Sequence, residues 1–140
     1  MVTVFDTSAL VAAHAMTHPR FAWADAQIQA AEQPALCAHS LAECYAVMTS
    51  HPQLRYPPVK VEQVLNRLAE TWTVLTLSSA DYLAAVARCR ELGLQGGAIY
   101  DTLIAEAAVK AGATQVVTLN AKHFVRLGED MRRIVVTPAD

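Results

Sequence analysis

Residues 2–10 read Val2-Thr3-Val4-Phe5-Asp6-Thr7-Ser8-Ala9-Leu10, an apolar segment that ends at an acidic residue and passes at once into a helix-forming segment. The β-branched and aromatic side chains of 3–5 predict a strand, and an uninterrupted apolar run is typical of a strand that is covered on both faces. A helix is expected over 8–14. This order predicts a parallel α/β sheet, with the first acidic residue where a strand ends and a helix begins.

The rest of the sequence repeats this alternation of short apolar segments and helical segments. Strands are expected at 35–38, 73–77, 115–119 and 134–136, and helices at 22–31, 40–49, 79–92, 99–111 and 121–127, with Ser40 and Ser79 as N-caps. Three prolines predict a loop over 51–58, and apolar residues at 61, 64, 65 and 68 predict an amphipathic helix after it. Strands separated by helices pair in parallel through right-handed crossovers, so the expected fold class is α/β.

Length and composition favour one domain with a buried core. The chain has 140 residues, of which 54% are hydrophobic and 17% are charged, and its net charge is -2. This composition is globular rather than disordered, and it gives no overall basic surface for nucleic acid. Cys37, Cys44 and Cys89 have no metal-ligand spacing and are expected to be reduced, mostly buried thiols. Because no apolar run approaches the ~18 residues of a membrane span, we expect a soluble, cytoplasmic protein.

Four polar residues each follow an apolar segment, namely Asp6, Glu43, Asp101 and Asn120. The carboxyl ends of parallel strands meet at one edge of a sheet, so these side chains are expected to converge. Three carboxylates in one place repel one another, which raises their pKa values unless a cation is bound. Mg²⁺ and Mn²⁺ prefer such oxygen ligands. The pattern therefore predicts a divalent-cation site at this edge.

Each acidic residue also has an ordinary structural explanation. Asp6 can cap the helix after it, and Asp101 lies in the first turn of its helix, where the macrodipole favours a negative charge. Ser40-Leu41-Ala42-Glu43 is a capping-box sequence, which would leave His39 outside the helix. The joint occurrence of the three at one sheet edge favours the metal site. The remaining histidines before residue 60, at 14, 18 and 51, are interpreted as surface or loop residues.

Four motifs together resemble those of the PIN domain, specifically the VapC-type toxins of type II toxin–antitoxin pairs. They are Phe5-Asp6-Thr7-Ser8-Ala9-Leu10, Ser40-Leu41-Ala42-Glu43, Tyr100-Asp101-Thr102-Leu103-Ile104-Ala105 and Thr118-Leu119-Asn120-Ala121-Lys122-His123-Phe124. The resemblance implies a single PIN-like domain over 1–140, folded as a three-layer α/β/α sandwich with a mostly parallel five-stranded sheet. It also implies a metal-dependent endoribonuclease.

The resemblance implies that Asp6, Glu43 and Asp101 bind the metal ion, Mg²⁺ or Mn²⁺, and that these three and Asn120 are the catalytic residues. Many members of the family have aspartate where Asn120 stands and often a second acid where His123 stands. Asparagine adds no charge, so we expect one firmly held ion and a second that arrives only with the substrate phosphate. The expected reaction is in-line attack on an RNA phosphodiester by a metal-activated water.

Substrate contacts are expected from residues around this site. They are Thr7, Ser8, Thr118, Lys122 and Arg55. The first three belong to the motifs and lie close to the acidic residues in the sequence. The two basic residues supply positive charge that the net charge of the chain lacks, and we expect modest, salt-sensitive binding of RNA.

The resemblance also implies two protein partners. One is a cognate antitoxin, whose tail would fill the acidic cleft, and the other is a second copy of the chain in a homodimer. Tyr45, Met48, Leu54 and Tyr56 are candidates for an exposed apolar patch that serves such contacts, although core packing explains Met48 and Tyr45 equally well. No membrane contact is expected.

Two other functions fit parts of the sequence. A phosphatase of the haloacid dehalogenase type also has a strand that ends in aspartate, but it needs a second aspartate two residues later, where this chain has Ser8. A PIN fold that binds RNA or protein without cleavage is the other alternative, because Asn120 and His123 depart from the family pattern. Metal-dependent cleavage of RNA would exclude it.

Overall fold

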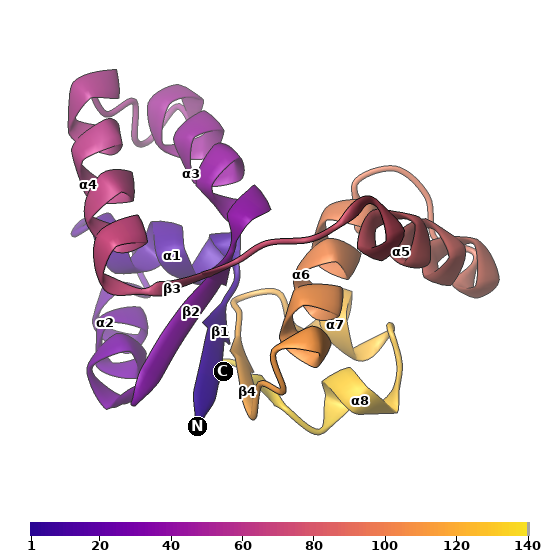
Figure 1. Ribbon diagram of the computed structural model, residues 1–140. Coiled ribbons are helices and arrows are strands. Elements are labelled where there is room, and N and C mark those ends of the chain that lie inside the picture. The colour runs from indigo at the N-terminus through magenta and orange to yellow at the C-terminus, as the bar shows by residue number, and fades with distance from the viewer. Residues whose placement is uncertain (140) are drawn as a thin grey trace.

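The computed structural model describes residues 1–139, in which five strands form one sheet of order β3-β2-β1-β4-β5 (Figure 1). The strands are β1 (Val2–Phe5), β2 (Gln33–Cys37), β3 (Thr73–Leu75), β4 (Gln115–Val117) and β5 (Val135–Val136). All four pairings between neighbours are parallel. The predicted α/β class with a parallel five-stranded sheet is confirmed, and β1 lies at its centre.

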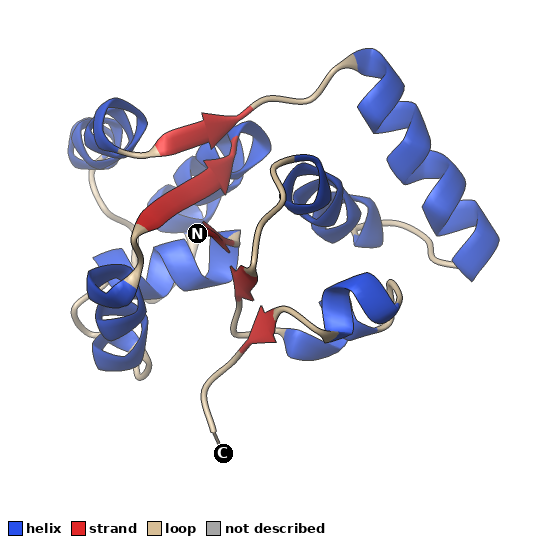
Figure 2. Cartoon of the chain, turned by 60° about the horizontal axis from the view of Figure 1, so that its bottom comes forward, coloured by secondary structure: helices blue, strands red, loops and turns tan. Residues whose placement is uncertain are grey.

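Helices cover both faces of the sheet. Within the described residues they are α1 (Thr7–His14), α2 (Phe21–Ala30), α3 (Ala38–Ser50), α4 (Pro58–Thr71), α5 (Ser79–Leu92), α6 (Ala98–Lys110), α7 (Ala121–Val125) and α8 (Glu129–Arg132). Figure 1 shows α1 to α4 on one side of the sheet and α5 to α8 on the other, and the turned view of Figure 2 also shows helices on both sides of the strands. This is the three-layer α/β/α arrangement that the resemblance to the PIN domain implies.

The two faces of the sheet belong to two separate buried cores. Val4 contributes to the core with α6, α7 and α8, whereas the next residue, Phe5, contributes to the core with α1, α3 and α4. Neighbouring residues of β2 and β4 divide in the same way, with Ala35 and Val116 in the first core and Leu36 and Val117 in the second. Both faces are therefore apolar, which explains why the strands read as continuous apolar runs.

Several element ends differ from the prediction. β3 ends at Leu75 and β4 at Val117, two residues earlier in each case than expected, because the backbone leaves the sheet to enter loops. Ser78, rather than Ser79, caps α5: its hydroxyl accepts a hydrogen bond from the Asp81 N–H, and the Asp81 carboxylate accepts one from the Ser78 N–H. The short helix α8 was not predicted, since four residues give no helical periodicity.

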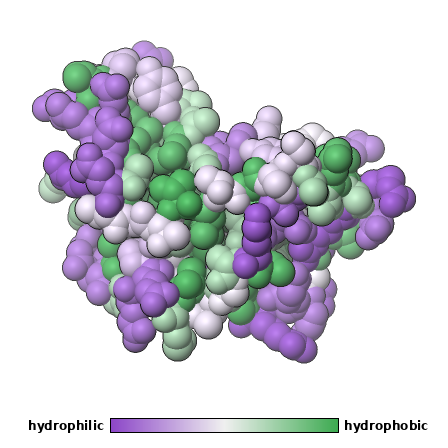
Figure 3. Space-filling model, in the orientation of Figure 1, coloured by the Kyte–Doolittle hydropathy of each residue, from purple (hydrophilic) through white to green (hydrophobic). Residues whose placement is uncertain are grey.

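Of the candidates for an exposed apolar patch, Met48 takes the alternative of core packing. Met48 is only 3% exposed and lies in the core with α1 and α4, while Leu54 and Tyr56 pack against the same core and are partly buried. Tyr45 is exposed. The space-filling view shows a notch between the α3–α4 side and the α5–α6 side, with hydrophobic surface along it (Figure 3).

The predictions about cysteines are confirmed. Cys37, Cys44 and Cys89 are all buried and unpaired. Burial raises the pKa of the Cys44 thiol to about 12, so this side chain behaves as a small apolar residue. Among residues 1–139, no helix combines the length and the apolar character that crossing a membrane requires.

Arg88 of α5 holds the C-terminal helices in place. Its Nε and Nη2 atoms donate to the Leu127 carbonyl at 3.2 and 2.8 Å, and Nη2 also donates to Asp130 at 2.7 Å. Its Nη1 atom lies 3.3 Å from Glu106 of α6, and the Arg88 side chain is 19% exposed. These contacts join α5 and α6 to the segment that follows Asn120.

We expect Arg88→Met to lower the free energy of unfolding by about 2 kcal/mol, because the Leu127 carbonyl and the two carboxylates lose their donor. The matched control is Arg90→Met on the same helix, because the Arg90 side chain is 75% exposed and, among residues 1–139, pairs only with Glu91 at 3.6 Å. This control should change stability by less than about 0.5 kcal/mol. Urea unfolding measures the free energy of unfolding of both variants. Equal losses in the two variants would contradict the role given to Arg88.

Candidate functional site

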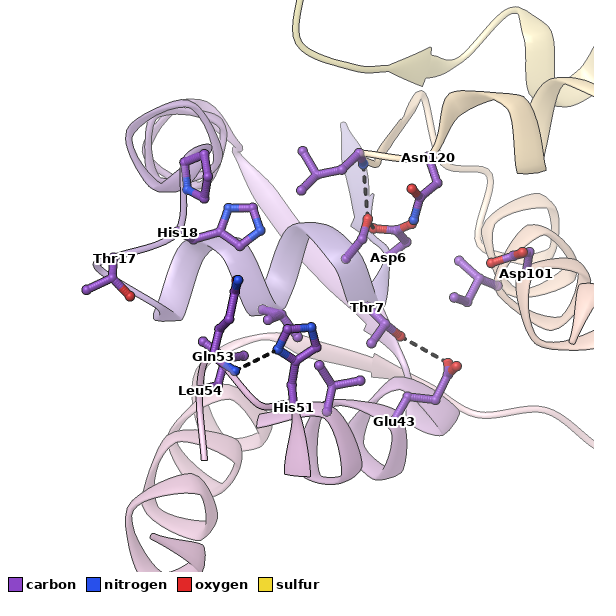
Figure 4. Close-up of a pocket in the computed structure, with 16 residues that line it drawn as sticks. Asp6, Thr7, Thr17, His18, Glu43, His51, Gln53, Leu54, Asp101 and Asn120 are labelled. Carbon is purple, nitrogen blue, oxygen red and sulfur yellow. Dashed lines mark hydrogen bonds between the residues drawn. The ribbon is translucent and has the colours of Figure 1, made fainter. Parts of the chain in front are cut away.

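A pocket of about 670 Å³ opens beside the carboxyl ends of β1 and β4. Six residues predicted for the site line it together: Asp6, Thr7, Ser8, Glu43, Asp101 and Asn120 (Figure 4). They come from the loops after β1 and β4 and from α1, α3 and α6. These six side chains therefore converge at one edge of the sheet, as predicted.

Asp6 is the best-restrained side chain of the pocket. Its Oδ1 accepts hydrogen bonds from the Ser8 hydroxyl at 2.7 Å and the Ala9 N–H at 2.9 Å, and its Oδ2 accepts one from the Thr118 hydroxyl at 2.6 Å. The residue is the N-cap of α1 and is only 3% exposed. Asp6 thus caps α1 and also faces the pocket, so its role as a helix cap does not exclude a role in the site.

Burial raises the pKa of Asp6 from 3.8 to about 6, although its three hydrogen bonds oppose the rise and the charge of Asp101 adds to it. Removing a carboxylate from water disfavours its charged form, which hydrogen bonds and a nearby opposite charge favour. A cation in the pocket would supply that charge. The three donors fix the side chain in place while leaving its charge uncompensated.

Glu43 is held by a contact that the sequence did not predict. The capping box of Ser40 and Glu43 does not form, because α3 begins at Ala38 with Cys37 as its N-cap, which places Ser40 inside the helix. Ser40 is fully buried, and the Thr7 hydroxyl lies 3.2 Å from its Oγ. Thr7 donates instead to Glu43 Oε1 at 3.0 Å, which turns the carboxylate toward the pocket.

His39 also lies inside α3, four residues before Glu43, and not outside the helix as predicted. Its ring stacks on that of Tyr100, with centroids 5.0 Å apart and planes inclined by 10°. The stack joins α3 to the first turn of α6. Because Glu43 and Asp101 lie next to this contact along their helices, it restrains the separation of the two carboxylates.

Asp101 lies in the first turn of α6 and is paired with a histidine. His123 Nδ1 is 3.3 Å from Asp101 Oδ2. Burial raises the pKa of Asp101, the charges of His123 and Arg126 oppose the rise, and the charge of Glu43 adds to it. The pocket therefore contains mutually repelling carboxylates with raised pKa values at Asp6 and Asp101.

The segment after β4 is attached to Asp6 through two hydroxyl groups. Thr118, which is fully buried, donates to Asp6 and accepts from the Asn120 N–H at 2.9 Å. Ser8 donates to Asp6 and accepts from the Leu119 N–H at 3.0 Å. Thr118 therefore lies behind Asp6 rather than on the pocket surface. These bonds fix the position of Asn120 relative to Asp6.

Besides Thr118, two more of the predicted substrate contacts are outside the pocket lining. Arg55 and Lys122 are exposed and are not among the described residues that line the pocket, so their contact with RNA stays a prediction. The pocket instead contains side chains for which no role was predicted, namely Thr17, His18, His51 and Gln53. The available signal was weak: each histidine stands before a proline in a loop, and nothing in the sequence indicates that the two loops meet.

The donor set fits a hydrated divalent cation. Within residues 1–139, no three aspartate, glutamate, histidine or cysteine side chains are gathered closely enough to hold one ion together. Mg²⁺ does not require this, because it keeps several waters and is commonly held by one or two carboxylates. The pocket offers carboxylate oxygens, and the raised pKa of Asp6 reflects a charge that a cation would stabilise.

Comparisons with known proteins support the assignment. Residues 3–130 match the PIN domain. Ribonuclease VapC27 of Mycobacterium tuberculosis is 33% identical over 106 residues, which are 75% of this chain and 75% of that protein. The structure of Mycobacterium tuberculosis VapC20, described as a toxin that cleaves the sarcin-ricin loop, gives a TM-score of 0.69 with 16% identity over 81% of this chain and 86% of that chain.

A second solved structure covers nearly the whole chain. It is a toxin–antitoxin complex from Klebsiella pneumoniae, with a TM-score of 0.69 and 21% identity over 99% of this chain and 98% of that chain. At such identities the two solved structures bear on the fold alone. The family match includes every residue from Asp6 to Asn120, and the identity to VapC27 extends over three quarters of both proteins. The chain therefore belongs to the PIN domain family and, within it, to the VapC-type proteins.

Proposed function

We propose that the protein is a metal-dependent endoribonuclease and the toxin of a toxin–antitoxin pair. The observation that carries this proposal is the convergence of Asp6, Glu43 and Asp101 on one pocket, with a raised pKa at two of them. Similarity to a protein named as a ribonuclease supports the activity. PIN-domain VapC nucleases depend in general on a metal ion, which supports Mg²⁺ or Mn²⁺ here.

In this proposal Asp6 and Asp101 hold the ion, and Glu43 holds it or orients the attacking water. The bound ion would lower the pKa of a water and offset negative charge on phosphate oxygens. The protein contributes groups that are already in position: three donors fix Asp6, Thr7 fixes Glu43, and His123 lies against Asp101. Groups that are already oriented stabilise the charge of a transition state most effectively, because they need no rearrangement during the reaction.

Asn120 and Thr118 have different parts in the proposal. Asn120 lies on the pocket surface and presents a neutral amide to water or phosphate, so one ion is firmly held. Thr118 is a positioning residue, because its hydroxyl bonds Asp6 from behind. Thr7 and Ser8 likewise act on the carboxylates beside them.

The proposed partners are RNA, a cognate antitoxin and a second copy of the chain. Complexes of a toxin with an antitoxin occur among the proteins of similar fold, which supports an antitoxin partner. The pocket fits such a partner, since a basic side chain would satisfy the uncompensated carboxylates. A cytoplasmic place of action fits an enzyme that acts on RNA.

A non-cleaving PIN domain is the second candidate. The contact between His123 and Asp101 favours it, because a protonated histidine would occupy a carboxylate that the metal needs. The first experiment below separates the two candidates.

We expect purified protein, free of any antitoxin, to cut total cellular RNA into discrete fragments with Mg²⁺ or Mn²⁺ and not with EDTA. Asp6→Asn and Asp101→Asn should each reduce the rate by at least about a hundredfold, since each removes a charge that holds the ion. Glu70→Gln, an exposed charge on α4, is the matched control and should cut like the wild type. Cleavage that survives in both aspartate variants would refute the site, and metal binding without cleavage would favour the second candidate.

The raised pKa of Asp6 predicts how stability depends on pH in the absence of metal. The folded value of about 6 exceeds the ordinary 3.8, so the folded state binds the proton more tightly than the unfolded chain does. This contribution to stability is complete below pH 3.8, declines as the pH rises to about 6, and is then absent. The difference in pKa corresponds to about 3 kcal/mol.

We therefore expect metal-free Asp6→Asn to be more stable than the wild type at pH 8 and to lose this advantage toward pH 4. Urea unfolding with EDTA at pH 8 and pH 4 measures the difference in free energy of unfolding between the variant and the wild type. Addition of Mg²⁺ should raise the melting temperature of the wild type and not that of the variant. An advantage of equal size at both pH values would show that Asp6 is not destabilised by its charge.

Asn120→Asp should add a fourth carboxylate to the pocket and make a second ion bind more tightly. Calorimetric titration with Mn²⁺ measures the number of sites, and we expect it to rise from one to two. Asn120→Ala is the control, because it removes the amide without adding charge. Unchanged stoichiometry in Asn120→Asp would argue against a second-ion position beside residue 120.

A further inference from the structure

The side of the pocket away from Asp101 is formed by two loops that the catalytic proposal does not use. The loop between α1 and α2 contributes Thr17 and His18, and the loop after α3 contributes His51 and Gln53. Figure 4 shows both imidazole rings on this side, with Asp6 and Thr7 between them and Asp101. We call these four residues the histidine end of the pocket.

Hydrogen bonds from the backbone fix the tautomer of both rings. The Arg20 N–H donates to His18 Nδ1 at 3.0 Å, and the Gln53 N–H donates to His51 Nδ1 at 3.2 Å. A backbone amide is only a donor, so each Nδ1 must carry a lone pair and each neutral ring must carry its proton on Nε2. His14 provides a contrast within the chain, because its Nδ1 lies 2.8 Å from the Leu10 carbonyl and must carry the proton itself.

This tautomer decides what the histidine end can bind. A protonated Nε2 has no lone pair for a metal ion, so a neutral ring in this state can only donate a hydrogen bond. Two such donors, one from each loop, suit a ligand with several acceptor oxygens. Most contacts between proteins and nucleic acids that are independent of base identity are donated to phosphate oxygens in this way.

The charges around the histidine end also fit an anion. The acidic residues among the described pocket lining are Asp6, Glu43 and Asp101, and they lie toward the other side of the pocket (Figure 4). Each of the two loops carries one exposed arginine, Arg20 in the first and Arg55 in the second. A phosphate at this end would therefore lie apart from the carboxylates that repel it.

The space between the two ends suits a nucleotide. The pocket volume of about 670 Å³ is in the range of sites for small organic ligands and far exceeds what one hydrated ion requires. Val11, Val47 and Leu54 give it an apolar wall. A chain of nucleotides could pass along this wall with one phosphate at each end.

We propose that His18 and His51 form a second phosphate subsite, which binds the RNA backbone at a phosphate neighbouring the one that is cleaved. The proposal rests on the proposed function for the identity of the ligand, and it adds the residues that hold the substrate in register. The two imidazoles act as positioning residues, since they donate to a phosphate that does not react.

The first test needs no cleavage. Long-range ¹H–¹⁵N spectra of histidine-labelled protein at pH 8 with EDTA report the tautomer of each ring, and single His→Gln variants assign the signals. We expect the Nε2–H form for His18 and His51 and the Nδ1–H form for His14. Adenosine 5′-monophosphate should then shift the signals of His18 and His51, whereas adenosine should leave them unchanged. The Nδ1–H form in either pocket ring, equal shifts with adenosine, or no shift with the monophosphate would overturn the proposal.

The second test uses RNA cleavage with two paired double variants. His18→Phe with His51→Phe keeps an aromatic ring at each position but removes both donors, and should raise KM about tenfold with kcat within about twofold. His18→Gln with His51→Gln keeps an N–H in each side chain and should stay within about threefold of the wild-type KM. Equal KM values for the phenylalanine pair and the wild type, or a loss confined to kcat, would contradict a phosphate subsite.

The two tests fail separately from the proposed function. If the wild type does not cut RNA, the endoribonuclease assignment fails, while the nucleotide spectra still decide whether the histidine end binds phosphate. If RNA is cut but the spectra show no response that depends on phosphate, the assignment stands and the subsite is refuted.

Discussion

The burial of one carboxylate is the constraint on which the site depends. Asp6 directly follows the central strand, caps α1 and accepts three hydrogen bonds, one of them from Thr118, which directly follows the neighbouring strand β4. The same bonds that place its oxygens also attach the segment leading to Asn120. The cost is a charge held away from water, which is seen as a pKa raised to about 6. A cation or a basic side chain placed beside the carboxylate would relieve that cost.

The other carboxylates are positioned by contacts between helices rather than by the sheet. Thr7 at the start of α1 holds Glu43 of α3, and the stacked rings of His39 and Tyr100 connect α3 with α6. Asp101 directly follows Tyr100 in α6, and its carboxylate contacts the imidazole of His123. Three helices from separate parts of the chain thus meet around the pocket. Their packing sets how far apart the carboxylates lie and how strongly they repel one another.

The fold could be predicted from the sequence because its signals are local or periodic. Apolar runs such as Val2-Thr3-Val4-Phe5 mark strands covered on both faces. The structure confirms this, because successive residues of a strand pack alternately into the two cores. The prediction was wrong where a local rule competed with packing. Ser40 and Glu43 form a favourable capping sequence, yet α3 begins earlier and both side chains turn to Thr7. Buried contacts between elements prevailed over a cap that stabilises a helix by about 1 kcal/mol.

The order of the strands and of the longer helices, and the acidic residues that follow the strands, could be identified from the sequence alone, because side-chain periodicity and chain reversal act over short distances. The partners of those residues depend instead on the packing of elements that are distant in the chain. Thr118 meets Asp6 across 112 positions, and His18 and His51 come to one pocket from loops that no pattern connects. The raised pKa of Asp6 has the same origin, since desolvation depends on everything packed around a group and not on its neighbours in the chain.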